Sequence, residues 1–210
     1  MGARETALNL ILQRLHGVSI KTPRARLTDL PSPVQHELMR LHRGLGGVLD
    51  APVLAPGEWD FAFADGLVVE LDEDLHFNRY RGMTLDLPWA DALPWTPAYR
   101  QHCLRGEEMC WKAGRLGGKW TSPSTVKMFG MGDPPGVFAS GGSPRWKQRA
   151  LYDAIKDAFA AFSGYHRLAR LSIHDVIAGA SVNGLLAGKS RVPESFIHEF
   201  LAARTTGVRS

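Results

Sequence analysis

The chain has 210 residues, of which 44% are hydrophobic and 22% are charged, and its formal net charge is +4. These values exclude an intrinsically disordered chain and predict a single domain over 1–210. The mildly basic charge suits a protein that binds polyanions. Because no stretch reaches the roughly 18 apolar residues of a membrane span and no signal peptide is recognisable, we expect a cytoplasmic protein that does not bind membranes.

Two helices are predicted in the first 47 residues. The apolar residues of 4–16 recur at helical spacing. After a proline-rich connector, Ser32 is the predicted N-cap of a second helix, which ends at the glycine pair 46–47. Residues 1–32 are therefore expected to form an N-terminal helix and connector outside the core of the fold.

Three strands are expected next. The first is a short strand over 48–57. The other two form a hairpin around Asp65-Gly66, a favoured hairpin turn. Apolar residues alternate along its first arm, 59–64, and the second arm, 67–72, is strongly apolar except for two acids.

The remaining chain contains one long irregular stretch followed by regular elements. Residues 73–143 hold four of the tryptophans and many prolines and glycines, with short helices expected around 97–113. Ser143 then caps a helix that stops at Gly164, and a strand follows it. A closing helix is predicted over 193–204 because its apolar residues have a helical period.

The second arm of the hairpin carries two acids among apolar residues. Glu70 and Asp72 share one face of the strand because strand side chains alternate with a period of two. A two-residue turn would place Asp60 opposite Leu71 and diagonal to both acids. Carboxylates this close repel one another when partly buried, and a divalent cation relieves the repulsion. The alternative is that these acids face solvent or pair with arginines nearby in the sequence.

The order of the elements and the acidic motif together resemble a known superfamily. The motif is Asp60-Phe61, the run GLVV, and then Glu70-Leu71-Asp72-Glu73-Asp74-Leu75-His76. This pattern resembles the PD-(D/E)XK restriction-endonuclease-like superfamily and, within it, the very-short-patch-repair-type endonucleases. Glu73 stands where those endonucleases often have glycine.

The resemblance implies an α/β (α+β) fold with a restriction-endonuclease-like αβββαβ core, whose mixed sheet is flanked by helices. Residues 33–72 and 144–175 would form that core. Residues 73–143 would be a long irregular insertion rich in tryptophan, proline and glycine, and 176–210 a C-terminal helical tail.

The resemblance also implies the residues of an active site. Asp60, Glu70 and Asp72 would hold Mg²⁺ or Mn²⁺, with Glu37 as an accessory metal ligand. His76 would handle the proton, although a histidine after a strand also occurs as a hydrogen-bonded structural residue. The superfamily usually has lysine two residues after the glutamate, where this chain has Asp72. A basic group from the following helix can replace that lysine, and Lys147 is the predicted candidate.

DNA is the expected partner. Gln148-x-x-x-Tyr152 resembles a motif of the RecB-like branch of the superfamily. Residues close to these motifs are predicted to contact DNA phosphates: Arg79, Arg81, Arg145, Gln148 and Arg149.

The leading hypothesis is therefore a metal-dependent DNA endonuclease. The second is a catalytically inactive nuclease-fold protein that binds nucleic acid or protein, because the usual lysine after Glu70 is missing. The third is an unrelated α/β protein whose tryptophan-rich insertion contacts a partner.

Overall fold

The computed structural model describes residues 2–162, 164 and 166–207. The α-helices and strands, in chain order, are α1 (Ala3–His16), α2 (Ser32–Gly44), β1 (Phe61–Ala62), β2 (Leu67–Asp72), α3 (Arg79–Thr84), α4 (Thr96–Gly114), α5 (Pro123–Phe129), α6 (Pro144–Phe162), β3 (Arg167–Ser172), β4 (Val176–Ile177), β5 (Ala180–Ser181), α7 (Val182–Leu186) and α8 (Glu194–Ala203). Short 3-10 turns are η1 (Leu27–Asp29), η2 (Asp74–His76), η3 (Ala90–Ala92) and η4 (Gly117–Lys119).

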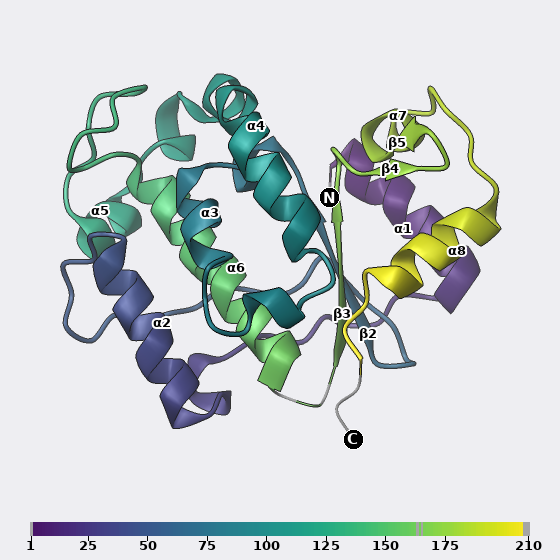
Figure 1. Ribbon diagram of the computed structural model, residues 1–210, viewed down its shortest axis with the longest axis horizontal. Helices are drawn as coiled ribbons and strands as arrows, with labels where there is room; N and C mark the ends of the chain where they lie inside the picture. The colour runs from purple at the N-terminus through teal and green to yellow at the C-terminus, as the bar shows by residue number, and fades with distance from the viewer. Residues whose placement is uncertain (1, 163, 165, 208–210) are drawn as a thin grey trace.

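A small mixed sheet lies between two layers of helices. Its order is β1-β2-β3, with β1 antiparallel and β3 parallel to β2. In Figure 1 the strands β2 and β3 stand edge-on, with α1 and α8 on one side and α2 to α6 on the other. The expected mixed α/β class with a mixed sheet flanked by helices is therefore confirmed.

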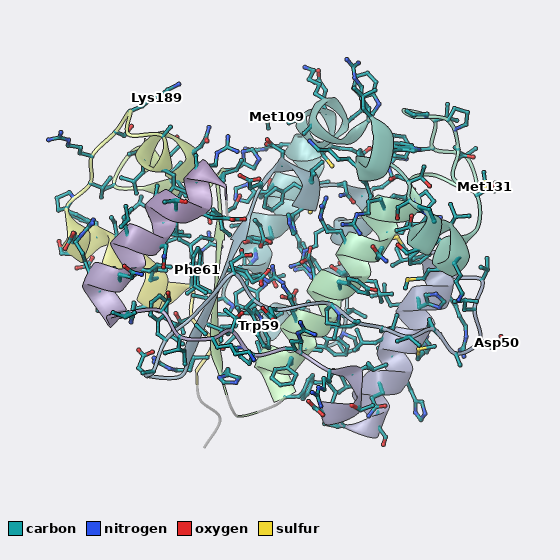
Figure 2. The ribbon with its side chains drawn as sticks, turned by 180° about the vertical axis from the view of Figure 1, so that it is seen from behind. Asp50, Trp59, Phe61, Met109, Met131 and Lys189 are labelled. Carbon is teal, nitrogen blue, oxygen red and sulfur yellow. The ribbon has the colours of Figure 1, made fainter. Side chains whose placement is uncertain are left out.

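Both faces of the sheet are buried, and each contacts a separate apolar core. Val68 belongs to the core that includes α2, α4 and α6. Val69, its neighbour in β2, belongs to the core formed with α1, α7 and α8. Figure 2 labels Trp59 and Phe61, which belong to different cores although they are only two residues apart. The chain bends at Asp60 between them, so the strand alternation begins only at β1.

Several predicted helices are confirmed at nearly the predicted bounds. Helix α1 covers the expected 4–16, and α8 covers most of 193–204. At 97–113, where short helices were expected, the chain forms one continuous helix, α4. Ser143 caps α6 as expected, because its hydroxyl accepts from the backbone N–H of Trp146 at 3.2 Å. Ser32 is not the N-cap of α2. It is the first helical residue, and Pro31 precedes it without a side-chain capping bond.

Two other expectations are wrong. Residues 48–57 form no strand: Pro52 and Pro56 supply no N–H to a ladder, and the side chain of Val53 is 86% exposed. Residues 73–143 are not mainly irregular, since α3, α4 and α5 lie within them and α3 and α5 pack against α6. Within the described part of the chain, every helix is too short or too polar to cross a membrane.

Candidate active site

The alternation of β2 sets the direction of its two acids. Glu70 and Asp72 lie on the same face of the strand as Val68, which contacts the core around α6. Both acids are buried, at 3% and 1% exposure. Their side chains therefore face α6 rather than solvent, which excludes the solvent-facing alternative for this pair.

Asp60 lies across the hairpin from Glu70. The register pairs Phe61 with Val69, so one further step brings Asp60 opposite Glu70, not opposite Leu71 as predicted. The register differs by one residue because Phe63 N–H donates to the Leu67 carbonyl, which leaves a three-residue turn. Asp60 Oδ2 accepts from the Leu71 N–H at 2.8 Å, so the side chain occupies the place of a ladder hydrogen bond.

Lys156 on α6 supplies the basic group beside these acids. Its Nζ donates to Glu70 Oε1 at 2.6 Å and to the Glu58 carbonyl at 2.8 Å. Sequence reasoning missed Lys156, although it stands on an alanine-rich helix in which Asp153, Lys156 and Asp157 share one face at i, i+3 and i+4. All three are buried, so a polar stripe on an otherwise apolar helix face was the available signal.

Lys147, the predicted lysine, lies elsewhere. Its Nζ lies 5.6 Å from the centre of the Tyr80 ring. It also lies next to Gly46, where an added Cβ would be 3.2 Å from the nitrogen. Lys147 and Lys156 are nine residues apart, which rotates them by about 180° around a helix with 3.6 residues per turn. They therefore project from opposite sides of α6, and only Lys156 reaches the acids.

The protein surroundings of Glu70 and Asp60 make a negative charge on either acid costly. Burial raises the pKa of Glu70 to about 7, although Lys156 and Arg170 both oppose that rise. Asp60 is solvent-exposed, so the solvent-facing alternative holds for this acid, yet the protein atoms packed around its carboxyl still raise its pKa to about 6 by burial. The Leu71 N–H and Lys156 oppose this second shift. A further cation at these oxygens would favour both charged forms.

Asp72, in contrast, already has a cation. Arg170, directly across from Glu70 on β3, donates to both Asp72 oxygens at 2.9 and 2.8 Å, and Tyr99 Oη donates to Oδ2 at 2.7 Å. Burial raises the pKa of Asp72, but Arg170 and His76 outweigh it and the pKa is lowered. A metal at Asp72 would therefore have to compete with Arg170 and Tyr99 for its oxygens.

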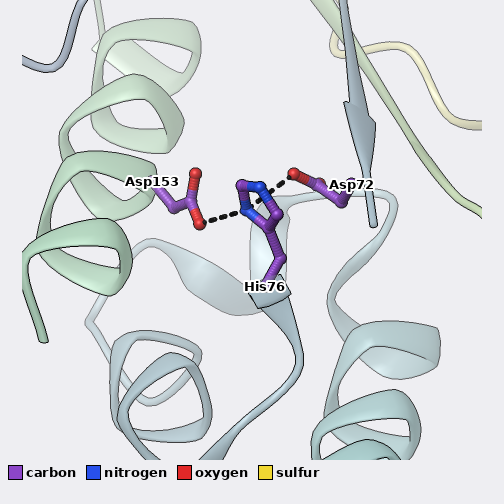
Figure 3. A group of neighbouring side chains, drawn as sticks. All are labelled: Asp72, His76 and Asp153. Atoms are coloured by element: carbon purple, nitrogen blue, oxygen red, sulfur yellow. Dashed lines mark hydrogen bonds and ion pairs between the residues drawn. The ribbon is translucent and has the colours of Figure 1, made fainter. Parts of the chain in front are cut away.

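His76 is held by two carboxylates (Figure 3). Its Nδ1 lies 2.8 Å from Asp153 Oδ2 and 3.1 Å from Asp72 Oδ1. Asp153 comes from α6 and was not predicted. These three residues also satisfy the distances of a metal site. However, Asp72 is already bound by Arg170, and both carboxylates contact the nitrogen that a metal would need.

The other predicted residues divide into those that line one cleft and those that do not. Glu37 pairs with Arg40 on the surface of α2 at 3.1 Å, and it is not among the residues that line the cleft.

Two of the predicted DNA-contacting arginines are also paired elsewhere. Arg81 is 1% exposed and pairs with Asp157 at 2.8 Å. Arg79 pairs with Glu107 and stacks on Phe138. The side chains of Glu37, Arg81 and Arg79 are thus each paired with an opposite charge and lie outside the residues that line the cleft.

The cleft has a volume of about 340 Å³ and runs beside α6. Glu5 from α1 and Glu73 lie at its edge. The predicted residues that do converge on it are Asp60, Glu70, His76, Arg145, Gln148 and Arg149, together with Tyr152, Asp153 and Lys156. Carboxylates, one histidine and several cations thus share a single concave site.

Comparisons with known proteins add one finding. No curated protein and no solved structure matches the chain. A model described as a family of unknown function, DUF7255, matches residues 40–188, which include Asp60, Glu70, Lys156 and all of α6. That match covers more than half of the 210 residues of the chain, so the chain belongs to the DUF7255 family.

Proposed function

We propose that this protein is a metal-dependent phosphodiesterase that cleaves DNA, with Asp60, Glu70 and Lys156 at its centre. The observation that carries the proposal is the convergence of these three side chains, from the hairpin and from α6, on one cleft. The order α2, β1, β2, α6 and β3, with β3 parallel to β2, is consistent with a restriction-endonuclease-like core that has lost one strand.

The donor set fits a hard divalent cation. Asp60 and Glu70 offer carboxylate oxygens only, and Mg²⁺ is typically held by one or two carboxylates with water and phosphate oxygens filling the other positions. The raised pKa values of both acids are consistent with a site that lacks positive charge. When bound there, the ion supplies a more acidic water and neutralises charge on the scissile phosphate.

The chain's own residues would divide the remaining work. Lys156 holds Glu70 in place at 2.6 Å and puts a positive charge beside the phosphate that is attacked. Asp153 and Asp72 hold His76 by Nδ1, which leaves Nε2 as the ring atom that can exchange a proton with the cleft. Replacement of the usual lysine by Asp72 is then compatible with activity, because Lys156 reaches the same acids from α6.

One observation favours the alternative, a binding module without catalysis. The Lys156–Glu70 ion pair at 2.6 Å neutralises Glu70 without a metal. Calorimetric titration with Mn²⁺ separates the two proposals. A nuclease takes up the ion and loses that uptake in Asp60→Asn and Glu70→Gln, whereas a binding module takes up none.

The direct test is cleavage of plasmid DNA with Mg²⁺ or Mn²⁺. We expect Asp60→Asn and Glu70→Gln to abolish cleavage, because each removes a charged ligand. Glu37→Gln is the matched control: it removes the same charge from a surface acid outside the cleft and should leave the rate unchanged. Cleavage that persists in both cleft variants, or that falls equally in the control, would contradict the assignment.

A further inference from the structure

The cleft has a second end, formed by the first two turns of α6. Arg145 and Arg149 line it there, one helical turn apart. Lys156 lies seven residues beyond Arg149, and at a rise of 1.5 Å per residue this places the two about 10 Å apart along the helix axis. The cleft therefore has acids and a lysine at one end and two arginines at the other.

These two arginines are half-buried and lack the carboxylate partners that the fully buried arginines have. Arg145 donates to the side-chain oxygen of Gln148, and Arg149 makes only a 3.5 Å contact with the Leu75 carbonyl. In the part of the chain that the structure describes, neither forms an ion pair with an acid. Arg170 and Arg81, by comparison, both pair with Asp157.

Arg149 is half-buried in the wall of the cleft. Burial lowers the pKa of Arg149 and the charge of Arg145 lowers it further, although the nearby charge of Asp153 opposes both effects. Asp153, one turn along the helix, has its Oδ2 occupied by His76. A recessed guanidinium beside a second cation is unfavourable without an anion, and a guanidinium fork matches the oxygens of a phosphate. The first turn of the 19-residue helix adds the positive end of its dipole.

We propose that Arg145 and Arg149 bind a phosphate group of the substrate strand that is distinct from the phosphate being cleaved. The inference rests on the proposed function, since it takes the Asp60–Glu70 end as the site of cleavage. A substrate that occupies both ends must carry at least two phosphates along one chain, which selects an oligonucleotide over a mononucleotide. A cleft of about 340 Å³ is of small-molecule size, so it holds a segment of one strand at a time, whether that strand is free or part of a duplex.

The test measures DNA binding without metal. A fluorescent single-stranded thymidine oligonucleotide is titrated by anisotropy in EDTA, at salt concentrations from about 50 to 200 mM. The Arg145→Gln/Arg149→Gln variant should bind about tenfold more weakly, as expected for the loss of charged hydrogen bonds. The slope of log K against log salt should fall by about 0.7, the value for one phosphate on a single strand.

Two further variants keep the result interpretable. Arg191→Gln removes one charge from an exposed position outside the cleft and should change neither affinity nor slope. Arg149→Lys keeps the charge but loses the fork, so the slope should be near wild type while the affinity stays lower. Comparing oligonucleotides with and without a 5′-phosphate then assigns the bound group as terminal or internal, and dependence on the two arginines supports the subsite in either case.

Mn²⁺ calorimetry on the same proteins distinguishes failure of this inference from failure of the proposed function. If the double variant still takes up Mn²⁺ but binds DNA more weakly, the result supports a separate phosphate site. Unchanged affinity and slope in the double variant overturn the subsite, even if the wild type binds Mn²⁺ and cleaves DNA. A wild type that neither takes up Mn²⁺ nor cleaves DNA overturns the proposed function and this inference with it.

Discussion

Lys156 Nζ lies 2.6 Å from Glu70 Oε1, which joins the middle of α6 to the middle strand of the sheet across 86 residues of sequence. Both side chains are almost entirely buried, at 9% and 4% exposure. A buried ion pair is costly to form but still more costly to break, because the partner left behind is an unpaired charge in a medium of low polarity. This pair is consequently the link between the stability of the fold and the chemistry of the candidate site.

Replacement of the lysine should destabilise the protein in a pH-dependent way. In Lys156→Met, Glu70 loses its closest cation, and we expect the free energy of unfolding to fall by about 3–5 kcal/mol near pH 8. The loss should be smaller near pH 5, where Glu70 takes up a proton. Urea denaturation at the two pH values measures both. Lys112→Met breaks an exposed i, i+4 pair with Glu108 and should leave the stability nearly unchanged. Equal losses in the two variants would contradict the prediction.

Local patterns in the sequence were sufficient for many of the elements. Ser143 and Pro144 indicate the start of α6, and the apolar run of 67–72 predicts β2 with its two acids on one face. The hairpin register was wrong because Gly66, at a φ of +83°, closes a turn one residue longer than the favoured two-residue form. A turn of either length is compatible with Asp65-Gly66, so the sequence alone does not decide between them.

The partners of the site residues were harder to predict than the residues themselves. Asp60 and Glu70 stand out because they are acids in apolar strands. Arg170, which neutralises Asp72, is 98 residues away in the chain, and no local period connects the two. Lys156 escaped prediction for the same reason: its role depends on the angle at which α6 crosses β2.

Metal binding should strengthen as the pH rises. The pKa values of Asp60 and Glu70 are raised to about 6 and 7, so protons compete with Mn²⁺ below that range. Calorimetry between pH 5.5 and 8 should show increasing affinity together with proton release. Glu70→Gln, which removes one ligand, should take up no Mn²⁺ at any pH in this range. An affinity that is independent of pH in the wild type would argue against these two acids as ligands.

The same shifts predict the sign of a stability change. A carboxyl whose folded pKa lies above its unfolded value binds more protons in the native state, so stability falls as pH rises between the two values. For Glu70 this window runs from about 4.5 to about 7. As the pH rises across that window, the wild type should therefore lose stability relative to Glu70→Gln. A constant difference would show that Glu70 is ionised throughout.

Arg170 should be the most sensitive charged position of the fold. Its guanidinium lies 2.8 Å from Asp72 and 2.7 Å from Asp157, with no exposed surface. Arg170→Met would leave two buried carboxylates without this partner, and we expect a loss of at least about 3–5 kcal/mol in urea denaturation. Arg167→Met, on the same strand, breaks a half-exposed pair with Asp65 and should cost at most about 1 kcal/mol. A similar small loss in both variants would mean that the buried network contributes little.

His76 should affect the rate of cleavage without affecting metal uptake. Burial raises the pKa of Asp153, but His76 and Arg170 outweigh that effect and hold the pKa well below its usual range, so Asp153 stays ionised beside Nδ1. His76→Asn removes the group that exchanges the proton, and we expect cleavage to slow by about 10²–10⁴-fold. Mn²⁺ affinity measured by calorimetry should be unchanged, because the ring is not a ligand of the Asp60–Glu70 site. His36→Asn alters an exposed histidine of α2 and serves as the control. A loss of stability with an unchanged rate would instead assign His76 a structural role between β2 and α6.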